Sequence, residues 1–254
     1  MKINVTNKVI KELSALSSAH MRKKSDLFLA EGERLVSSVP KGLIKYYVLP
    51  EKSEITPQHG DLPVYTVSEK EYFSLCQTVN PQGIACVCRK FTCEWDELFV
   101  KSPALIVLCE NLQDPGNLGT IIRTADAAGA SGLILTKGCC DIFNPKVLRS
   151  AMGSVFNLPI LTNADFEECA EFLKSQGIQL LAAHLKGEKT PYETDMTFPT
   201  AILIGNEAKG LSERAEKAAD RLVKLPMLGK AESLNAAVAA ALIIYEAVRQ
   251  RYTL

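Results

Sequence analysis

Histidine and long apolar runs are both scarce in this chain. Only three of its 254 residues are histidine, namely His20, His59 and His184. None lies in the polar loops described below, which disfavours a histidine-based catalytic mechanism. The longest apolar run, residues 236–245, has ten residues, about half of the roughly 20 that a membrane-spanning helix needs. We therefore expect no membrane attachment.

Export signals and disulfide-forming patterns are missing as well. The first residues lack the apolar stretch of a secretion signal. Eight cysteines are too few for a disulfide scaffold in a chain of 254 residues, so reduced thiols and a cytoplasmic location are expected. No Gly-x-Gly-x-x-Gly follows an expected strand, which argues against a dinucleotide site. Cys86, Cys88 and Cys93 lack the paired spacing of a structural zinc site, and no bound metal is expected.

The chain has no net charge, with 29 basic and 29 acidic residues, but the charges are unevenly distributed. Residues 1–50 contain nine Lys or Arg against four Asp or Glu, a local charge of +5, so the remaining residues carry −5. This basic end is either a surface for phosphate groups or an ordinary solvated helix and loop. Charge alone leaves both interpretations open.

The first half of the chain predicts a small α/β domain. From Asn4 to Leu16 apolar residues recur at helical spacing, including Val5 and Val9. A basic loop is expected at residues 21–25, and short apolar runs predict strands at 28–30, 43–49, 64–67 and 84–87. Ser68, with Glu71 three residues later, has the spacing of a helix-capping box. The polar stretch 89–103, with a helical turn at 95–99, separates a domain of residues 1–95 from a second of residues 104–254.

The second half alternates predicted strands and helices. A continuous apolar run of strand length occurs at residues 104–109, and further strands are expected at 133–136, 179–183, 201–204 and 222–225. Helices are expected at 117–129, 145–152, 166–176 and 234–251. This alternation predicts a parallel sheet with helices on both faces. In such sheets, ligands bind beyond the carboxyl ends of the strands.

Three loops at these strand ends combine asparagine, glycine and charged residues. The first, residues 110–119, contains Asn117, which we expect to cap the following helix. Six residues later, Arg123 either serves the site or pairs with Asp126 in a surface ion pair. The third loop, residues 225–235, contains Ser233 as the expected cap of the last helix. Asn235 then falls inside an alanine-rich helix, where asparagine is unfavourable, and this favours a functional reason for it.

The second loop, residues 205–212, places Glu207 between Gly205 and Gly210. Its two glycines and Ser212 imitate a triphosphate-binding loop, but Leu211 stands where the phosphate-binding lysine is needed, which excludes that function. Glycines directly after a buried strand let a ligand approach the backbone closely. Nothing in a plain turn requires the carboxylate of Glu207.

Together the three loops resemble the signature of the SpoU (TrmH-type) RNA 2′-O-ribose methyltransferases of the SPOUT superfamily. The likeness covers residues 104–254 and consists of three motifs in the family's order and spacing. They are Asn117-x-Gly119-x3-Arg123-x-Ala125, Ile204-Gly205-Asn206-Glu207-x2-Gly210-Leu211 and Pro226-Met227-x-Gly229-x3-Ser233-Leu234-Asn235. More loosely, the N-terminal helix, the basic loop and residues 28–35 resemble the family's substrate-binding domain, which is similar to a kink-turn-binding ribosomal protein.

The resemblance implies a fold, a cofactor and partners. The implied fold is α/β: a C-terminal parallel-sheet SPOUT domain with a deep trefoil knot, preceded by a smaller α/β substrate-binding domain. General folding rules argue against knots, so only the resemblance suggests this one. The implied cofactor is S-adenosylmethionine. The implied partners are RNA and a second copy of the chain, in a homodimer packed through the knotted domain, with the last helix at or near the interface.

The resemblance also implies roles for individual residues. The implied cofactor-binding residues are Ile204, Gly205, Asn206, Gly210, Leu225, Met227, Ser233 and Leu234. Arg123 is the implied catalytic residue, supported by Asn117, Glu207 and Asn235. In the basic N-terminal region, we expect three adjacent residues to contact RNA phosphates without sequence preference. These are Arg22, Lys23 and Lys24.

A guanidinium group is effectively always protonated in proteins. We therefore expect Arg123 to hold the phosphate beside the target ribose, while solvent or that phosphate accepts the proton. A full N-terminal domain favours structured ribosomal RNA over transfer RNA, which remains the alternative substrate. The intact motif residues disfavour a catalytically inactive RNA-binding protein. The expected activity is S-adenosylmethionine-dependent methylation of a ribose 2′-hydroxyl in ribosomal RNA.

Overall fold

The chain divides into two compact units, each formed by two separate stretches of sequence. The computed structural model describes residues 2–4, 7–76, 78 and 80–252. The first unit joins Met1–Phe91 to Ile142–Phe156, and the second joins Thr92–Asp141 to Asn157–Leu254. Segment 142–156 lies within the second half of the sequence but belongs to the first unit, which the predicted boundary did not anticipate.

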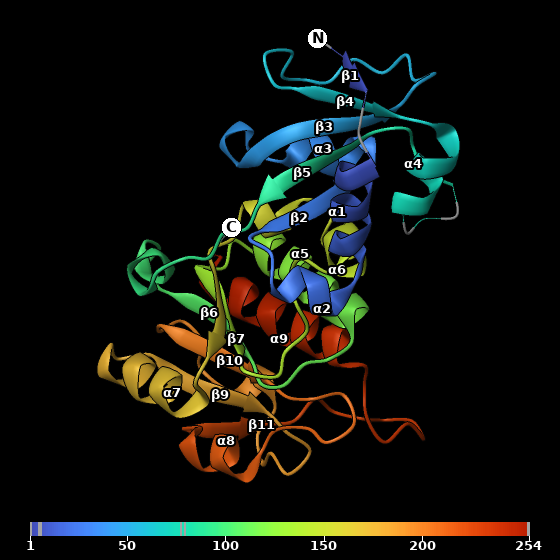
Figure 1. Cartoon of the computed structure of the whole chain (residues 1–254). Helices are drawn as coiled ribbons and strands as arrows, with labels where there is room; N and C mark the ends of the chain where they lie inside the picture. The colour runs from blue at the N-terminus through green and yellow to red at the C-terminus, as the bar shows by residue number, and fades with distance from the viewer. Residues whose placement is uncertain (1, 5–6, 77, 79, 253–254) are drawn as a thin grey trace. The chain divides into compact units, whose positions relative to one another are not determined.

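The first unit contains a mixed five-stranded sheet in the order β1-β4-β3-β5-β2 (Figure 1). Strand β5 runs antiparallel to β2 and β3, whereas β1, β4 and β3 pair in parallel. The strands are β1 (Lys2–Asn4), β2 (Leu27–Glu31), β3 (Ile44–Pro50), β4 (Val64–Val67) and β5 (Ala85–Arg89). The helices are α1 (Asn7–Ser17), α2 (Ala19–Lys23), α3 (Glu33–Ser38), α4 (Glu69–Leu75) and α6 (Pro145–Ala151), with 3-10 turns η1 (Lys41–Leu43) and η3 (Ser154–Phe156).

The four strands predicted in this half are confirmed, and so is the capping box of α4. The backbone N of Glu71 donates to Ser68 Oγ (3.3 Å), and the backbone N of Ser68 donates to Glu71 Oε2 (2.9 Å). Two predictions are wrong. The expected basic loop is largely helix α2, and Asn4 belongs to strand β1 instead of to the first helix. Val5, part of the predicted helical pattern, lies outside the described residues.

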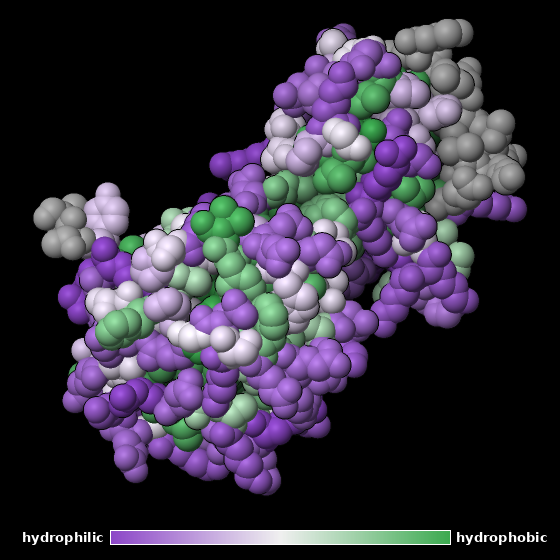
Figure 2. Space-filling model, turned by 90° about the vertical axis from the view of Figure 1, so that its left-hand side faces the viewer, coloured by the Kyte–Doolittle hydropathy of each residue, from purple (hydrophilic) through white to green (hydrophobic). Residues whose placement is uncertain are grey.

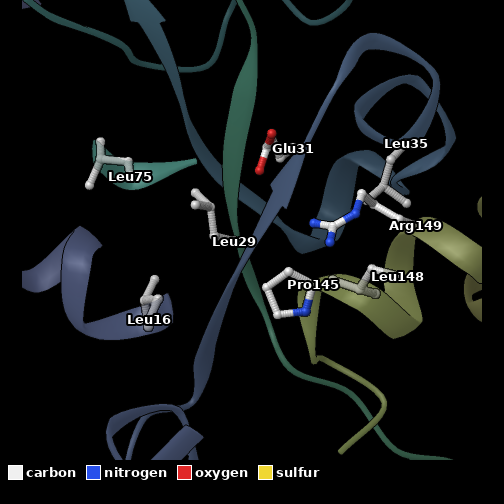
Figure 3. Close-up of a pocket in the computed structure, with 8 residues that line it drawn as sticks. All are labelled: Leu16, Leu29, Glu31, Leu35, Leu75, Pro145, Leu148 and Arg149. Atoms are coloured by element: carbon white, nitrogen blue, oxygen red, sulfur yellow. The ribbon is translucent and has the colours of Figure 1, made fainter. Parts of the chain in front are cut away.

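Segment 142–156 completes the core of the first unit beside the edge strand β2. The ring of Phe28 lies 4.7 Å from that of Phe143 and 6.4 Å from that of Phe156, measured between centroids. Nearby, leucines of α1, β2, α3, α4 and α6 line a cavity of about 10 Å³ (Figure 3). This volume holds about one water molecule. The cavity is therefore too small to be a ligand site.

The second unit contains the predicted parallel sheet. Its six strands lie in the order β11-β9-β10-β6-β7-β8, and every neighbouring pair is parallel. The strands are β6 (Leu105–Cys109), β7 (Gly132–Thr136), β8 (Ile160–Ala164), β9 (Gln179–Ala183), β10 (Thr200–Ile204) and β11 (Arg221–Val223). The helices are α5 (Pro115–Ala127), α7 (Phe166–Ser175), α8 (Glu213–Ala218) and α9 (Ala236–Arg251), with 3-10 turns η2 (Trp95–Phe99) and η4 (Pro191–Glu193).

Helices cover both faces of this sheet. Figure 1 shows α7 and α8 on one side and α5 and α9 on the other. Strands β6 and β10 are buried along their whole length, which explains why their sequences are continuous apolar runs. On the face of the molecule in Figure 2, hydrophilic side chains predominate and hydrophobic atoms show between them. Within the described ranges, no helix is long and apolar enough to cross a membrane.

Two helices of the second unit begin differently from the sequence prediction. Asp114, not Asn117, caps α5: its Oδ1 accepts from the backbone N of Asn117 (2.8 Å). Pro115 takes the first helical position, where its missing N–H costs nothing. Helix α9 begins at Ala236 with Asn235 as its cap, so Asn235 does not lie in the helix interior. The side chain of Asn117 is therefore free for another role.

Candidate functional site

The three polar loops meet at one edge of the parallel sheet. Residues 110–114 follow β6, residues 205–212 follow β10 and residues 224–235 follow β11. Strands β6 and β10 are neighbours in the sheet, so their carboxyl ends bring the first two loops together. The third loop joins them through the start of α9, which packs against α5 and β10.

Glu207, Asn117 and Asn235 form a continuous hydrogen-bonded chain across these loops, which we term the amide–carboxylate chain. Glu207 Oε1 accepts from Asn117 Nδ2 (3.2 Å) and from the backbone N of Asp114 (2.8 Å). Its Oε2 accepts from the backbone N of Gln113 (3.2 Å). Asn117 Oδ1 accepts from Asn235 Nδ2 (2.9 Å). Asn117 thus contacts Glu207, which is 90 positions away in the sequence, and Asn235, which is 118 positions away.

The orientation of both amides follows from the helix cap. Asn235 Oδ1 accepts from the backbone N of Ala237 (2.9 Å) and of Val238 (3.3 Å). Its Nδ2 must therefore donate, so Asn117 presents its oxygen to Asn235 and its Nδ2 to Glu207. An ionised carboxylate can only accept hydrogen bonds, so Glu207 is a suitable partner for Asn117 Nδ2.

The same contacts keep Glu207 ionised. Partial burial raises the pKa of Glu207, but hydrogen bonds lower it by more, chiefly those from the backbone N–H of Asp114 and of Glu207 itself and then that from Asn117. The net effect is a pKa below the usual value for glutamate. At neutral pH, Glu207 is consequently a charged anchor whose two oxygens already accept hydrogen bonds, and it is a poor proton acceptor.

A cavity of about 420 Å³ lies among the second and third loops and the start of α9. Its volume falls within the range of small-molecule sites, about 300–1,000 Å³. Glu207 also lines it, so the cavity adjoins the amide–carboxylate chain. All eight predicted cofactor-binding residues line the cavity: Ile204, Gly205, Asn206, Gly210, Leu225, Met227, Ser233 and Leu234.

Gly205 is required for a reason that differs from the sequence interpretation. A Cβ at Gly205 would lie 2.3 Å from the carbonyl carbon of Gly210 and from the backbone N of Leu211. The glycine thus permits the loop to fold back on itself, and not primarily the approach of a ligand. Gly210 has φ of +71° with open space around its Cβ position, so there the backbone conformation is the requirement.

Arg123 lies on α5, exposed and apart from the amide–carboxylate chain. Six residues of helix correspond to a rise of about 9 Å and a rotation of about 240° from Asn117. Within the described part of the chain it forms no ion pair with Asp126, whose Oδ2 instead accepts from Asn157 Nδ2 (3.2 Å). The surface ion pair considered for Arg123 is therefore not formed.

The three basic residues predicted to contact RNA do not share one environment. Lys23 and Lys24 are exposed, but Arg22 is only 2% exposed, and its Nη1 donates to the carbonyl oxygen of Leu16 (3.0 Å). The prediction for Arg22 is wrong in this conformation, because its guanidinium joins α2 to the end of α1. Charge counting could not separate it from its two neighbours.

Sequence reasoning missed several residues near the cavity. His184, Leu185 and Lys186 follow β9 and line the cavity wall. His184 Nδ1 accepts from the backbone N of Lys186 (3.1 Å), and its Nε2 lies 3.1 Å from Glu216 Oε1. Their position directly after a parallel strand was a usable signal, because ligands bind at that edge.

A parallel sheet with a small-molecule cavity and a polar chain beyond its strand ends defines an α/β enzyme domain. Residues 104–245 match the model of the SpoU rRNA methylase family, and residues 7–86 match that of the MRM3-like substrate binding domain. The first match spans more than half of the chain. The protein belongs to the SpoU rRNA methylase family.

Individual relatives cover nearly the whole chain. It is 34% identical over 242 residues to the "23S rRNA (guanosine(2553)-2'-O)-methyltransferase RlmP" of Bacillus subtilis, covering 94% of this chain and 95% of that one. The SpoU methyltransferase AviRb of Streptomyces viridochromogenes, solved with AdoMet, superimposes with a TM-score of 0.87 at 31% identity, covering 97% and 98% of the two chains. An AdoMet-bound rRNA methyltransferase of Sinorhizobium meliloti gives 0.87 at 32% identity, covering 99% of each chain.

Proposed function

We propose that this protein transfers a methyl group from S-adenosylmethionine to a ribose 2′-hydroxyl of ribosomal RNA. The observation that carries the proposal is the amide–carboxylate chain beside the 420 Å³ cavity, in a member of the SpoU family. The curated relative from Bacillus subtilis is named for this reaction on 23S rRNA, and two solved relatives contain the cofactor. The size and lining of the cavity suit the cofactor.

The eight cavity residues named above are proposed to hold S-adenosylmethionine. Ile204, Leu225, Met227 and Leu234 provide apolar surface for a purine ring and for the methylene groups of the methionyl chain, and the loop backbone provides polar groups. When bound, the cofactor supplies an activated sulfonium methyl group. The residues of the protein then have to place the ribose 2′-oxygen against that methyl group and allow the hydroxyl proton to leave. Alignment alone can lower the activation barrier by several kcal/mol, up to about 7–11.

Arg123 is proposed to hold the phosphate beside the target ribose. Guanidinium groups carry a permanent positive charge in proteins, so the proposed role of Arg123 is to bind an anion and not to remove a proton. Glu207 is also unsuited to accept the proton, because its pKa is lowered and both oxygens accept hydrogen bonds. Asn117 and Asn235, oriented by Glu207 and by the cap of α9, are proposed to support the reacting centre. Solvent or the bound phosphate is left as the proton acceptor.

Ribose-methylation mapping of total RNA from cells with and without the gene tests the proposed function. We expect one 2′-O-methyl mark of ribosomal RNA to disappear with the gene and to return with the wild-type copy. A mark lost from a transfer RNA instead would favour the alternative substrate. Unchanged methylation of every RNA would favour a catalytically inactive RNA-binding protein.

Lys23 and Lys24 are proposed to contact RNA phosphates. Replacing both by Ala is expected to weaken RNA binding and to lower the slope of log affinity against log salt by about 1.4–1.8, because each lost phosphate contact removes about 0.7–0.9. Filter binding over a salt series measures the slope, and affinity for S-adenosylmethionine serves as the internal check. Lys41→Ala is the control, since Lys41 is already paired with Asp61 at 2.8 Å. An unaltered slope in the double variant would leave Lys23 and Lys24 as ordinary solubilising charges.

A homodimer packed through α9 is proposed as the assembly. Val238, Leu242 and Tyr245 are 48%, 43% and 49% exposed at helical spacing, and they form an apolar stripe on α9. Light scattering is expected to give a dimer at micromolar concentration. Leu242→Glu should weaken it by about tenfold or more, because the carboxylate would be buried without a partner. Phe73→Glu, at a similarly exposed site in the first unit, should leave the dimer intact, and a monomeric wild type would contradict the proposal.

Three expectations from the sequence remain proposals alongside these. They are the deep trefoil knot in the second unit, the likeness of the first unit to a kink-turn-binding ribosomal protein, and the cytoplasmic location. The parallel strand order of the second unit is compatible with the knotted family fold. Cell fractionation with an antibody against the chain tests the location.

A further inference from the structure

Glu110 is a buried carboxylate directly after β6. It is 4% exposed. Its Oε2 accepts from the backbone N of Ser212 (2.8 Å), and its Oε1 accepts from Ser212 Oγ (2.7 Å) and from Arg214 Nε (3.3 Å). A carboxylate buried this deeply needs such donors to remain in the fold. Glu110 consequently holds Ser212 in one position.

Ser212 ends the loop that begins at Gly205, and the other end of this loop is held by the same segment. Asn206 Nδ2 donates to the carbonyl oxygen of Asn111 (2.9 Å), the neighbour of Glu110. Asn206 and Gly210 also exchange two backbone hydrogen bonds, of 3.0 and 2.8 Å. The loop that carries Glu207 is thus tied at both ends to residues 110–111.

We propose that Glu110 is a positioning residue for methyl transfer. By holding Ser212, it fixes the loop that sets Glu207 against Asn117 and that forms one wall of the cofactor cavity. This inference rests on the proposed function, because it gives Glu110 a part in that reaction. Glu110 is not one of the described residues that line the cavity, so it acts through the loop.

Glu110→Gln is the informative change, because it keeps the shape of the side chain. A carboxamide has one acceptor oxygen and a donor NH₂ group, whereas Ser212 offers two donors to Glu110. The backbone N of Ser212 and Arg214 Nε bind different oxygens of Glu110 and can only donate, so one of them then faces the NH₂ group and loses its partner, whereas the Ser212 hydroxyl can turn and accept. The loop is expected to loosen at its Ser212 end, while the tie through Asn206 remains.

Two other carboxylates provide matched controls. Glu167 accepts from Nη1 of the same Arg214 (2.9 and 3.0 Å) but, among the described residues, makes no hydrogen bond or ion pair with the loop 205–212. Glu246 is 5% exposed and binds Arg249 and Gln250 on α9. Glu167→Gln therefore isolates the pair with Arg214, and Glu246→Gln isolates the general cost of altering a buried carboxylate.

The experiment compares these variants by the dissociation constant for S-adenosylmethionine, kcat and KM on an rRNA fragment, the thermal midpoint and amide hydrogen exchange. Glu110→Gln is expected to weaken cofactor binding and to lower kcat by about tenfold each, and to speed exchange of the amides in residues 207–210. Glu167→Gln and Glu246→Gln should stay within about twofold of wild type in binding and kcat, whatever their midpoints. Ser212→Ala removes the same side-chain contact and also the cap of α8, where Ser212 Oγ accepts from the backbone N of Ala215 (3.3 Å). Its thermal midpoint should therefore fall, but in cofactor binding and kcat the double variant with Glu110→Gln should be little worse than Glu110→Gln alone.

A fall in the midpoint without a change in binding, kcat or exchange would overturn the inference. So would equal losses in Glu246→Gln, or effects of Glu110→Gln and Ser212→Ala that simply multiply. Should Glu110→Gln not fold, Glu110→Asp and Ser212→Ala decide by the same readouts. If the wild type binds the cofactor but methylates no rRNA, the proposed function fails, while cofactor affinity and loop exchange still decide the role of Glu110.

Discussion

Arg123→Ala is expected to lower kcat for methyl transfer to ribosomal RNA by about 100- to 1,000-fold, the usual loss when one donor that stabilises the transition state is removed. Affinity for S-adenosylmethionine should not change, because Arg123 lies on α5 and is absent from the described residues that line the cavity. Single-turnover methylation and calorimetric titration measure the two quantities separately.

Arg123→Lys distinguishes geometry from charge. If Arg123 holds a phosphate through its planar fork, lysine should be nearly as damaging as alanine, since an ammonium group cannot make the bidentate contact. Recovery of most of the turnover with lysine would show that charge alone suffices. Arg221→Ala is the control: Arg221 is exposed at the amino end of β11 and is not among the described residues that line the cavity. Normal turnover in both Arg123 variants would remove the catalytic assignment.

Gly205→Val is expected to abolish binding of S-adenosylmethionine and to lower the thermal midpoint. The first side-chain carbon alone would lie 2.3 Å from backbone atoms of Gly210 and Leu211, so the loop 205–212 must open to accept it. Overpacking of this kind costs about 1–3 kcal/mol, and opening also displaces the wall of the cavity.

Gly205→Ala distinguishes a local loss of cofactor binding from a general loss of folding, because it adds a single carbon. We expect it to fold, as judged by circular dichroism, but to bind the cofactor at least about 100-fold more weakly by calorimetry. Gly42→Ala is the control, because its Cβ position has no atom within 4 Å. Unchanged binding in Gly205→Ala would refute the assignment of this loop to the cofactor site.

Much of the second unit could be predicted because its signals are local. Five of the six described strands were predicted, most clearly the buried strands β6 and β10, whose sequences are continuous apolar runs. Strand β8 was missed because Thr162 and Asn163 interrupt its pattern, and Asn163 has a positive φ of 58°. Helix α8 was missed because only Ala215 is buried along its six residues.

The candidate site was predictable in composition but not in its connections. The resemblance to the family assigned Asn117, Glu207 and Asn235 to one site, but motif spacing could not reveal which of their atoms form hydrogen bonds. Asn235 was assigned to the helix interior, although its oxygen caps α9. The burial of Arg22 depends on the packing of α2 against α1. Counting charges in the sequence cannot predict that packing.

Segment 142–156 has a consequence for the order of events during translation. The ring of Phe28 packs against Phe143 and Phe156, which the ribosome adds 52 and 65 residues after Phe91. At about 5–20 residues per second, the newly made N-terminal stretch waits roughly 3–13 s for the last of these rings. During that interval Phe28 lacks its partners on an edge strand, a situation that favours aggregation or capture by a chaperone. A gene fragment that stops at the apparent domain boundary would make this transient state permanent.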